Sequence, residues 1–207
     1  MNTFPVARPY DPVFDAQKHY RALLQCTARP GTIGQLDDVS VEVPQQLNRA
    51  TVLIALTLFS SDTTFSFAQD EDRALHFLCR ETSAKIASIG QADFLIIADA
   101  SQAGVVRQAR RGVLAYPDQG ATLIVQVAAI SPAPVLGGLR LTLSGPGIET
   151  ETVLYVFGAP AELFEILREQ NAEFPMGIDT YLTCNSLSMG PCVLALPRTT
   201  KVLWERV

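Results

Sequence analysis

The apolar run from Thr122 to Ala129 is the feature of this sequence that most constrains its fold. A near-continuous apolar segment of this length is typical of a β-strand that is covered on both faces. Such a strand needs a layer of other elements on each side of its sheet. The run therefore predicts an α/β fold with a buried sheet at its centre.

The helices that cover this sheet are predicted from caps and spacing. Asp11-Pro12 is typical of a helix start, and Arg29-Pro30-Gly31 of its end. Between them, apolar and small residues recur at helical spacing: Val13, Ala16, Tyr20, Leu23, Leu24 and Thr27. A second helix follows Asn48, and because it is apolar on all sides we expect it to be deeply buried. We expect a short helix over residues 101–111 and an amphipathic one over residues 160–170.

The second half of the chain is rich in strand patterns. Residues 139–143 alternate in polarity, residues 152–157 form another strand candidate, and the Pro/Gly stretch from Ser131 to Gly138 is expected to be a hairpin loop. Three last segments should complete the sheet: Tyr181–Cys184, Val193–Leu196 and Lys201–Trp204. Residues 1–207 are therefore expected to form a single α/β domain, with a mixed β-sheet flanked by helices.

Charge and cysteine content narrow the function. The net charge of −5 provides no basic field that would follow a phosphate backbone, so we expect no nucleic-acid partner. The four cysteines are scattered, which argues against a zinc or iron–sulfur site within this chain, and no metal is expected. The N-terminus does not resemble a signal peptide, and no apolar stretch is long enough to span a bilayer. We expect a cytoplasmic protein with no membrane association.

Candidate ligand residues lie near the C-terminus. In Pro197-Arg198-Thr199-Thr200 one guanidinium and two hydroxyl groups stand beside an apolar strand, a set that suits a phosphate or the carboxylate of a partner. An edge-strand salt bridge explains the same residues. Asp179 is either a turn cap or a ligand contact. His19 and His76 are predicted to be surface or boundary residues, and no catalytic residue is identified.

Several short phrases, in order, resemble the PhnH family, the H subunit of the bacterial carbon–phosphorus lyase core complex. The resemblance covers residues 14 to 200 and rests on these phrases: Phe14-Asp15-Ala16-Gln17, Arg29-Pro30-Gly31, Gly120-Ala121-Thr122-Leu123-Ile124-Val125-Gln126-Val127, Leu141-Thr142-Leu143-Ser144-Gly145-Pro146-Gly147-Ile148, Phe174-Pro175-Met176-Gly177-Ile178-Asp179 and Leu196-Pro197-Arg198-Thr199-Thr200. It implies a fold similar to pyridoxal-phosphate-dependent transferases, without that cofactor.

The resemblance also implies a role in phosphonate catabolism. The family is an accessory, non-catalytic subunit that acts with the G, I and J subunits. The assembly forms ribose 1-alkylphosphonate 5-triphosphate from ATP and alkylphosphonate and releases adenine. We expect no cofactor in this chain and a homodimer when the chain is purified alone. The alternative functions are a stand-alone transferase or hydrolase, or a phosphonate- or nucleotide-binding module, with a pocket around Arg198, Thr199 and Asp179.

The expectation of an extensive interface also has a basis in composition. Charged residues make up 18% of the chain, and several aromatic residues lie outside the expected core stripes: Phe4, Tyr10, Tyr116, Tyr155 and Phe157. Interfaces of obligate complexes are likewise rich in apolar residues and resemble the core of a domain. These residues therefore predict a homodimer in isolation and a hetero-oligomer in the cell.

Overall fold

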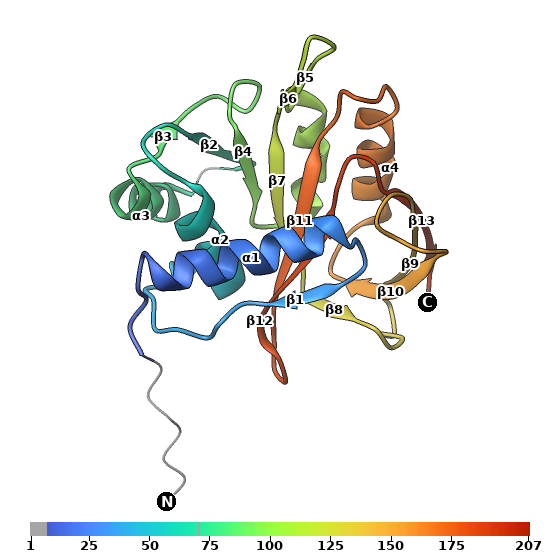
Figure 1. Ribbon diagram of the computed structural model, residues 1–207, viewed down its shortest axis with the longest axis horizontal. Helices are drawn as coiled ribbons and strands as arrows, with labels where there is room; N and C mark the ends of the chain where they lie inside the picture. The colour runs from blue at the N-terminus through green and yellow to red at the C-terminus, as the bar shows by residue number, and fades with distance from the viewer. Residues whose placement is uncertain (1–7, 70) are drawn as a thin grey trace, which may run out of the picture.

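The computed structural model describes residues 8–69 and 71–207 of the chain (Figure 1). Its helices are α1 (Phe14–Ala28), α2 (Arg49–Leu58), α3 (Asp72–Thr82), the 3₁₀-helix η1 (Ala100–Gln108) and α4 (Ala161–Gln170). Its strands are β1 (Ile33–Gln35), β2 (Thr64–Phe67), β3 (Lys85–Ile86), β4 (Phe94–Ile97), β5 (Arg111–Val113), β6 (Tyr116–Gly120), β7 (Thr122–Gln126), β8 (Ala129–Ser131), β9 (Leu139–Ser144), β10 (Thr152–Phe157), β11 (Asp179–Ser186), β12 (Gly190–Leu196) and β13 (Lys201–Arg206).

The central sheet has seven strands in the order β1-β12-β11-β7-β4-β2-β3. From β11 to β3 the neighbouring strands are parallel, whereas β12 is antiparallel to both β11 and β1. The predicted strand β7 lies in the middle. Leu123 and Val125 face one hydrophobic core and Ile124 faces the other, and all three are fully buried. The predicted α/β fold with a mixed sheet is confirmed.

The two faces of this sheet are covered differently. Helices α1, α2 and α3 cover one face, where Leu53, Ile54 and Phe65 pack together. Helix η1, helix α4 and a second sheet cover the other face. In Figure 1, α1 crosses in front of β11, while α4 lies beside β13. No helix within the described residues is long and apolar enough to cross a membrane.

The second sheet is antiparallel, with the strand order β13-β9-β10-β8. Two expectations are corrected here. Strand β13 joins this second sheet instead of completing the central one. Residues 132–138 link β8 to β9, which lie on opposite sides of β10, so this segment is not a hairpin loop. Along β9, alternate residues are buried against the central sheet, as the alternating sequence predicted.

Helix boundaries follow the caps closely. The side chain of Asn48 accepts a hydrogen bond from the Thr51 N–H at 2.8 Å and so caps α2, whose residues Ala50 to Ala55 are buried as expected. The short helix predicted over residues 101–111 is confirmed for most of its length as the 3₁₀-helix η1, but it ends at Gln108, and the chain enters β5 at Arg111. That strand forms a small hairpin with β6.

Helix α1 buries a face that its apolar spacing did not indicate. Its buried residues are Asp15, His19, Leu23 and Cys26. Tyr20 and Leu24 are 53% and 56% exposed. The prediction of a surface or boundary histidine was therefore wrong for His19, which is 1% exposed, and correct for His76. The buried face is set by the ion pairing of Asp15 described below, which composition alone does not reveal.

Candidate functional site

The fold brings two of the four candidate residues, Asp179 and Arg198, into direct contact. Asp179 is the first residue of β11, and Arg198 lies in the connection between β12 and β13. Thr199 is half-buried in the same connection. Thr200 is 9% exposed, its N–H donates to the Pro197 carbonyl at 2.8 Å, and its Oγ1 has no hydrogen-bond partner among the described residues.

Arg198 makes a two-pronged ion pair with Asp179. Its Nη2 lies 2.7 Å from Asp179 Oδ2 and its Nε lies 3.2 Å from the same oxygen. The Arg198 backbone N–H donates to Asp179 Oδ1 at 2.8 Å. Nη1 donates to the Pro117 carbonyl at 2.7 Å. The Arg198 side chain is only 14% exposed. Its guanidinium therefore makes mostly buried contacts that link the β12–β13 connection to Asp179 and to Pro117.

Two glycines allow the backbone to approach this ion pair. A Cβ on Gly120 would lie 2.3 Å from the Gly177 carbonyl oxygen and 3.1 Å from Arg198 Nη1. Gly177 has a φ of +152°, and a Cβ there would lie 2.5 Å from Asn171 Oδ1. Three of the phrases that resemble the PhnH family therefore meet at the amino ends of β7 and β11. We call this set (Gly120, Gly177, Asp179 and Arg198) the amino-end cluster. Its geometry supports bracing of these segments, and ligand or partner binding by Arg198, Thr199, Thr200 and Asp179 stays a prediction.

A second polar network lies at the opposite, carboxyl ends of the same strands. Gln126 Nε2 donates to the carbonyls of Gln46 and Ala98 at 2.9 and 3.1 Å. Gln126 Oε1 accepts from the N–H of Asn48, and Asn48 Nδ2 donates to the Thr183 carbonyl at 3.2 Å. Sequence reasoning identified Asn48 as a helix start but missed Gln126, the single long polar side chain in the run from Thr122 to Ala129. That interruption was the available signal.

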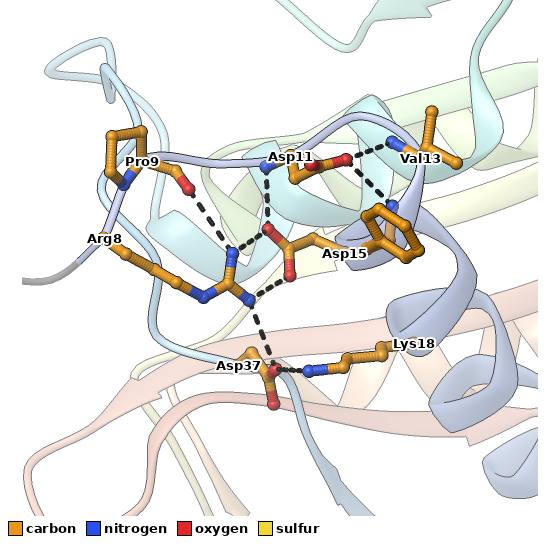
Figure 2. Close-up of polar contacts among 8 residues, drawn as sticks. Arg8, Pro9, Asp11, Val13, Asp15, Lys18 and Asp37 are labelled. Atoms are coloured by element: carbon orange, nitrogen blue, oxygen red, sulfur yellow. Dashed lines mark hydrogen bonds and ion pairs between the residues drawn. The ribbon is translucent and has the colours of Figure 1, made fainter.

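The third polar cluster fixes the N-terminal segment on α1 (Figure 2). Asp15 is fully buried, and its Oδ2 accepts from Arg8 Nη1 at 2.6 Å and from the Asp11 N–H at 2.7 Å. Arg8 Nη2 binds the other carboxylate oxygen. The hydrogen bonds from Arg8 lower the pKa of Asp15 to about 2. Asp11 Oδ1 accepts from the N–H groups of Val13 and Phe14 at 2.8 and 2.9 Å, which confirms that Asp11 caps this helix.

The cysteines and the buried histidine are poorly suited to nucleophilic chemistry. Burial raises the pKa of Cys26 and of Cys184 to about 11, which keeps both thiols protonated at neutral pH. Cys184 and Cys192 are direct cross-strand neighbours, and both are buried. Burial lowers the pKa of His19, whose two ring nitrogens have no hydrogen-bond partner among the described residues. Within residues 8–69 and 71–207, no group of three or more His, Cys, Asp or Glu side chains is placed to hold a metal ion.

Comparison with known proteins connects these features to a family. The family model described as "Bacterial phosphonate metabolism protein (PhnH)" matches residues 9–203. The chain is 34% identical over 195 residues to the Rhizobium meliloti (strain 1021) protein named alpha-D-ribose 1-methylphosphonate 5-triphosphate synthase subunit PhnH, covering 93% of this chain and 92% of that protein. It is 30% identical over 191 residues to the Stutzerimonas stutzeri protein named "Putative C-P lyase subunit protein HtxG", covering 90% of this chain and 85% of the relative. The chain belongs to the PhnH family of bacterial phosphonate metabolism proteins.

Proposed function

We propose that this protein is an accessory subunit of a carbon–phosphorus lyase core complex. The observation that carries the proposal is the family match, which spans residues 9–203. A relative with 34% identity is named as a subunit of a synthase of ribose 1-methylphosphonate 5-triphosphate. In this role the chain supports formation of ribose 1-alkylphosphonate 5-triphosphate from ATP and alkylphosphonate, with release of adenine, together with G, I and J subunits.

The chemistry of the described side chains supports a subunit that is inactive alone. The buried thiols with raised pKa values are weak nucleophiles, and the guanidinium of Arg198 is engaged by Asp179. All three lysines (Lys18, Lys85 and Lys201) are exposed, whereas a Schiff-base lysine works inside a cofactor pocket.

A fold similar to a cofactor-less pyridoxal-phosphate transferase is part of this proposal. So is a cytoplasmic location, which four unpaired cysteines support.

An apolar stripe on α1 suits the contact with other subunits. Val13, Tyr20 and Leu24 are 70%, 53% and 56% exposed. Positions i, i+7 and i+11 lie on one side of a helix, so the three side chains form a row along its outer surface. We call these three residues the α1 stripe. Exposed apolar side chains that gather on one face are typical of protein–protein contacts.

Substitution of Leu24→Glu should therefore weaken assembly while the chain stays folded, because a charge in the middle of an apolar contact must lose its hydration. We expect at least a tenfold loss of co-purification with the G, I and J subunits, and a matching loss of adenine release from ATP plus methylphosphonate. The chain alone should release no adenine. Gln25→Glu, on an exposed position beside the stripe, is the matched control. Normal assembly of the Leu24→Glu variant would remove the stripe from the interface, and adenine release by the pure chain would contradict the accessory role.

The homodimer expected for the isolated chain has a candidate contact at the edge strand β13. If two β13 strands pair antiparallel about Leu203, each Lys201 faces the partner's Glu205, and each Val202 faces the partner's Trp204. Leu203 is 67% exposed and points to the same side as Lys201 and Glu205. Strand pairing of this kind continues the second sheet into the other copy and covers the β13 edge of each copy. Of the residues named for the interface, Tyr116 and Phe157 are 58% and 41% exposed, while Phe4 lies outside the described residues.

We expect Leu203→Asp to convert the isolated protein to a monomer, because two carboxylates would face one another at the centre of the pair. Sedimentation velocity at micromolar concentration measures the change. Leu114→Asp is the control, since Leu114 is 74% exposed at the turn of the β5–β6 hairpin, away from β13. A Leu203→Asp protein that remains dimeric would rule out this strand contact without affecting the accessory role.

A further inference from the structure

A cavity of about 530 Å³ lies between α3 and the segment from Glu42 to Gln46. Its α3 wall carries Arg73, His76, Phe77 and Arg80. Phe77 is 6% exposed and forms an apolar base, whereas Arg73, His76 and Arg80 are exposed. The volume lies within the range of small-molecule binding sites, roughly 300–1,000 Å³.

The cavity is next to the place where the central sheet reverses its winding. After β2 the chain enters α3 on one face of the sheet, and after the neighbouring β4 it enters η1 on the other face. In α/β sheets, ligands bind outside the carboxyl ends of the strands at such a reversal. Gln126 Nε2 binds the carbonyl of Gln46, in the cavity wall, and that of Ala98, directly after β4. This bond ties the cavity wall to the carboxyl ends of the strands.

The basic side chains form a row instead of a single point. Arg73, His76 and Arg80 are at helix positions i, i+3 and i+7, which spreads them over about 10 Å of one helix side. A chain of linked phosphoryl groups can contact such a row along its whole length. We propose that this cavity binds a chain of linked phosphoryl groups, as found in a nucleoside triphosphate or in a free polyphosphate.

Glu42 is expected to weaken the binding of a phosphoryl chain, because its carboxylate already pairs with Arg80. Arg80 Nη2 lies 3.0 Å from Glu42 Oε2, Arg80 Nε lies 2.7 Å from Glu81 Oε1, and the guanidinium lies 5.4 Å from the centre of the Phe77 ring. Arg73 has no ion-pair partner in the described parts of the chain. A phosphoryl chain must therefore compete with the Glu42 and Glu81 carboxylates for Arg80.

Isothermal titration calorimetry of the isolated chain at low salt tests this site without any partner subunit, so its outcome is independent of assembly. The probes are inorganic tripolyphosphate, ATP and orthophosphate, without divalent metal. We expect tripolyphosphate to bind at least about tenfold more tightly than orthophosphate. Arg73→Ala should weaken tripolyphosphate binding by about tenfold, since it removes one charge-assisted contact. His76→Gln should weaken it less, since the glutamine amide can still donate a hydrogen bond. Glu42→Gln should strengthen it about threefold. Arg21→Ala, on the exposed surface of α1, should have no effect.

The two sources of the phosphoryl chain are separated by the ATP titration. Tighter binding of ATP than of tripolyphosphate indicates a nucleoside triphosphate, and equal binding indicates the free chain. Equal affinity for orthophosphate and tripolyphosphate would overturn the proposal. So would unchanged binding in the Arg73→Ala and His76→Gln variants, or a loss of the same size in Arg21→Ala. All four substituted side chains are at the surface, so the variants should fold, and far-UV circular dichroism checks this.

Discussion

The Gly120→Ala variant should unfold at a temperature roughly 6 to 12 °C below that of the wild-type protein. A Cβ at this position would lie 2.3 Å from the carbonyl oxygen of Gly177, and backbone atoms cannot move aside as a flexible side chain does. The loop that carries Gly177 must shift, which also disturbs the contact of Arg198 with Asp179. Overpacking of this kind costs about 3 kcal/mol, and in a chain of this size each kcal/mol lowers the midpoint by about 2–4 °C. Differential scanning calorimetry measures the change.

Gly104→Ala is the matched control for this prediction. Gly104 lies in η1, and a Cβ there would meet no atom within 4 Å. Its midpoint should be unchanged or slightly higher, because alanine restricts the unfolded chain more than glycine does. Equal midpoints for the two variants would show that the amino-end cluster tolerates displacement and does not brace the fold.

Replacing Asp15 by Asn should lower the free energy of unfolding by about 2 kcal/mol at pH 7. The carboxylate is fully buried and its charge is matched by Arg8, whose side chain is 51% exposed. Asn keeps the shape but removes the charge, so the hydrogen bonds from Arg8 become weaker. Chemical denaturation of both proteins over a pH series measures the difference. Glu162→Gln is the control, since its contact with Arg107 is exposed and should contribute less than about 1 kcal/mol.

The pH dependence of this difference follows from the sign of the pKa shift. The folded-state pKa of Asp15 is about 2, below the unfolded value of about 3.9. The stabilisation is therefore fully present above the unfolded pKa and is lost as the pH falls through the folded pKa. The gap between wild type and Asp15→Asn should be constant from pH 5 to pH 8 and should close toward pH 2. A gap that stays constant down to pH 2 would mean that the pairing with Arg8 does not stabilise the protein.

The sequence predicted the elements whose local signals agree with their packing. The apolar run at β7 indicates a buried strand, and Asn48 indicates the start of a helix. Both predictions are confirmed. The amphipathic helix predicted over residues 160–170 is α4, which buries one side through Leu163, Phe164, Ile166 and Leu167. By contrast, the buried face of α1 depends on the ion pair of Asp15 with Arg8, seven residues before it. Several of the apolar residues at helical spacing in α1 are exposed instead of buried. An ion pair with a residue outside the helix overrode the periodicity there.

The candidate site was likewise predicted in part from the local sequence. Arg198 and Asp179 were identified as candidates because charged groups beside apolar strands need a partner. Their mutual ion pair spans 19 residues of sequence and follows from β11 lying next to β12, which no local pattern predicts. The cavity beside α3 was missed because its two walls come from segments about 30 residues apart. Only the sheet order shows that these walls meet next to the reversal in winding.

The position of β1 has a consequence for synthesis of the chain on the ribosome. Within the described residues, β1 pairs in the sheet with β12 alone, and α1 packs against both strands. Residues 190–196 are translated long after residues 33–35, so β1 has no strand to pair with until they have emerged, although α1 can already pack on α2. Long-range pairing of this kind slows folding and leaves apolar surface open in the meantime. The nascent chain should therefore depend on chaperones that shield the segment around β1 until β12 has emerged.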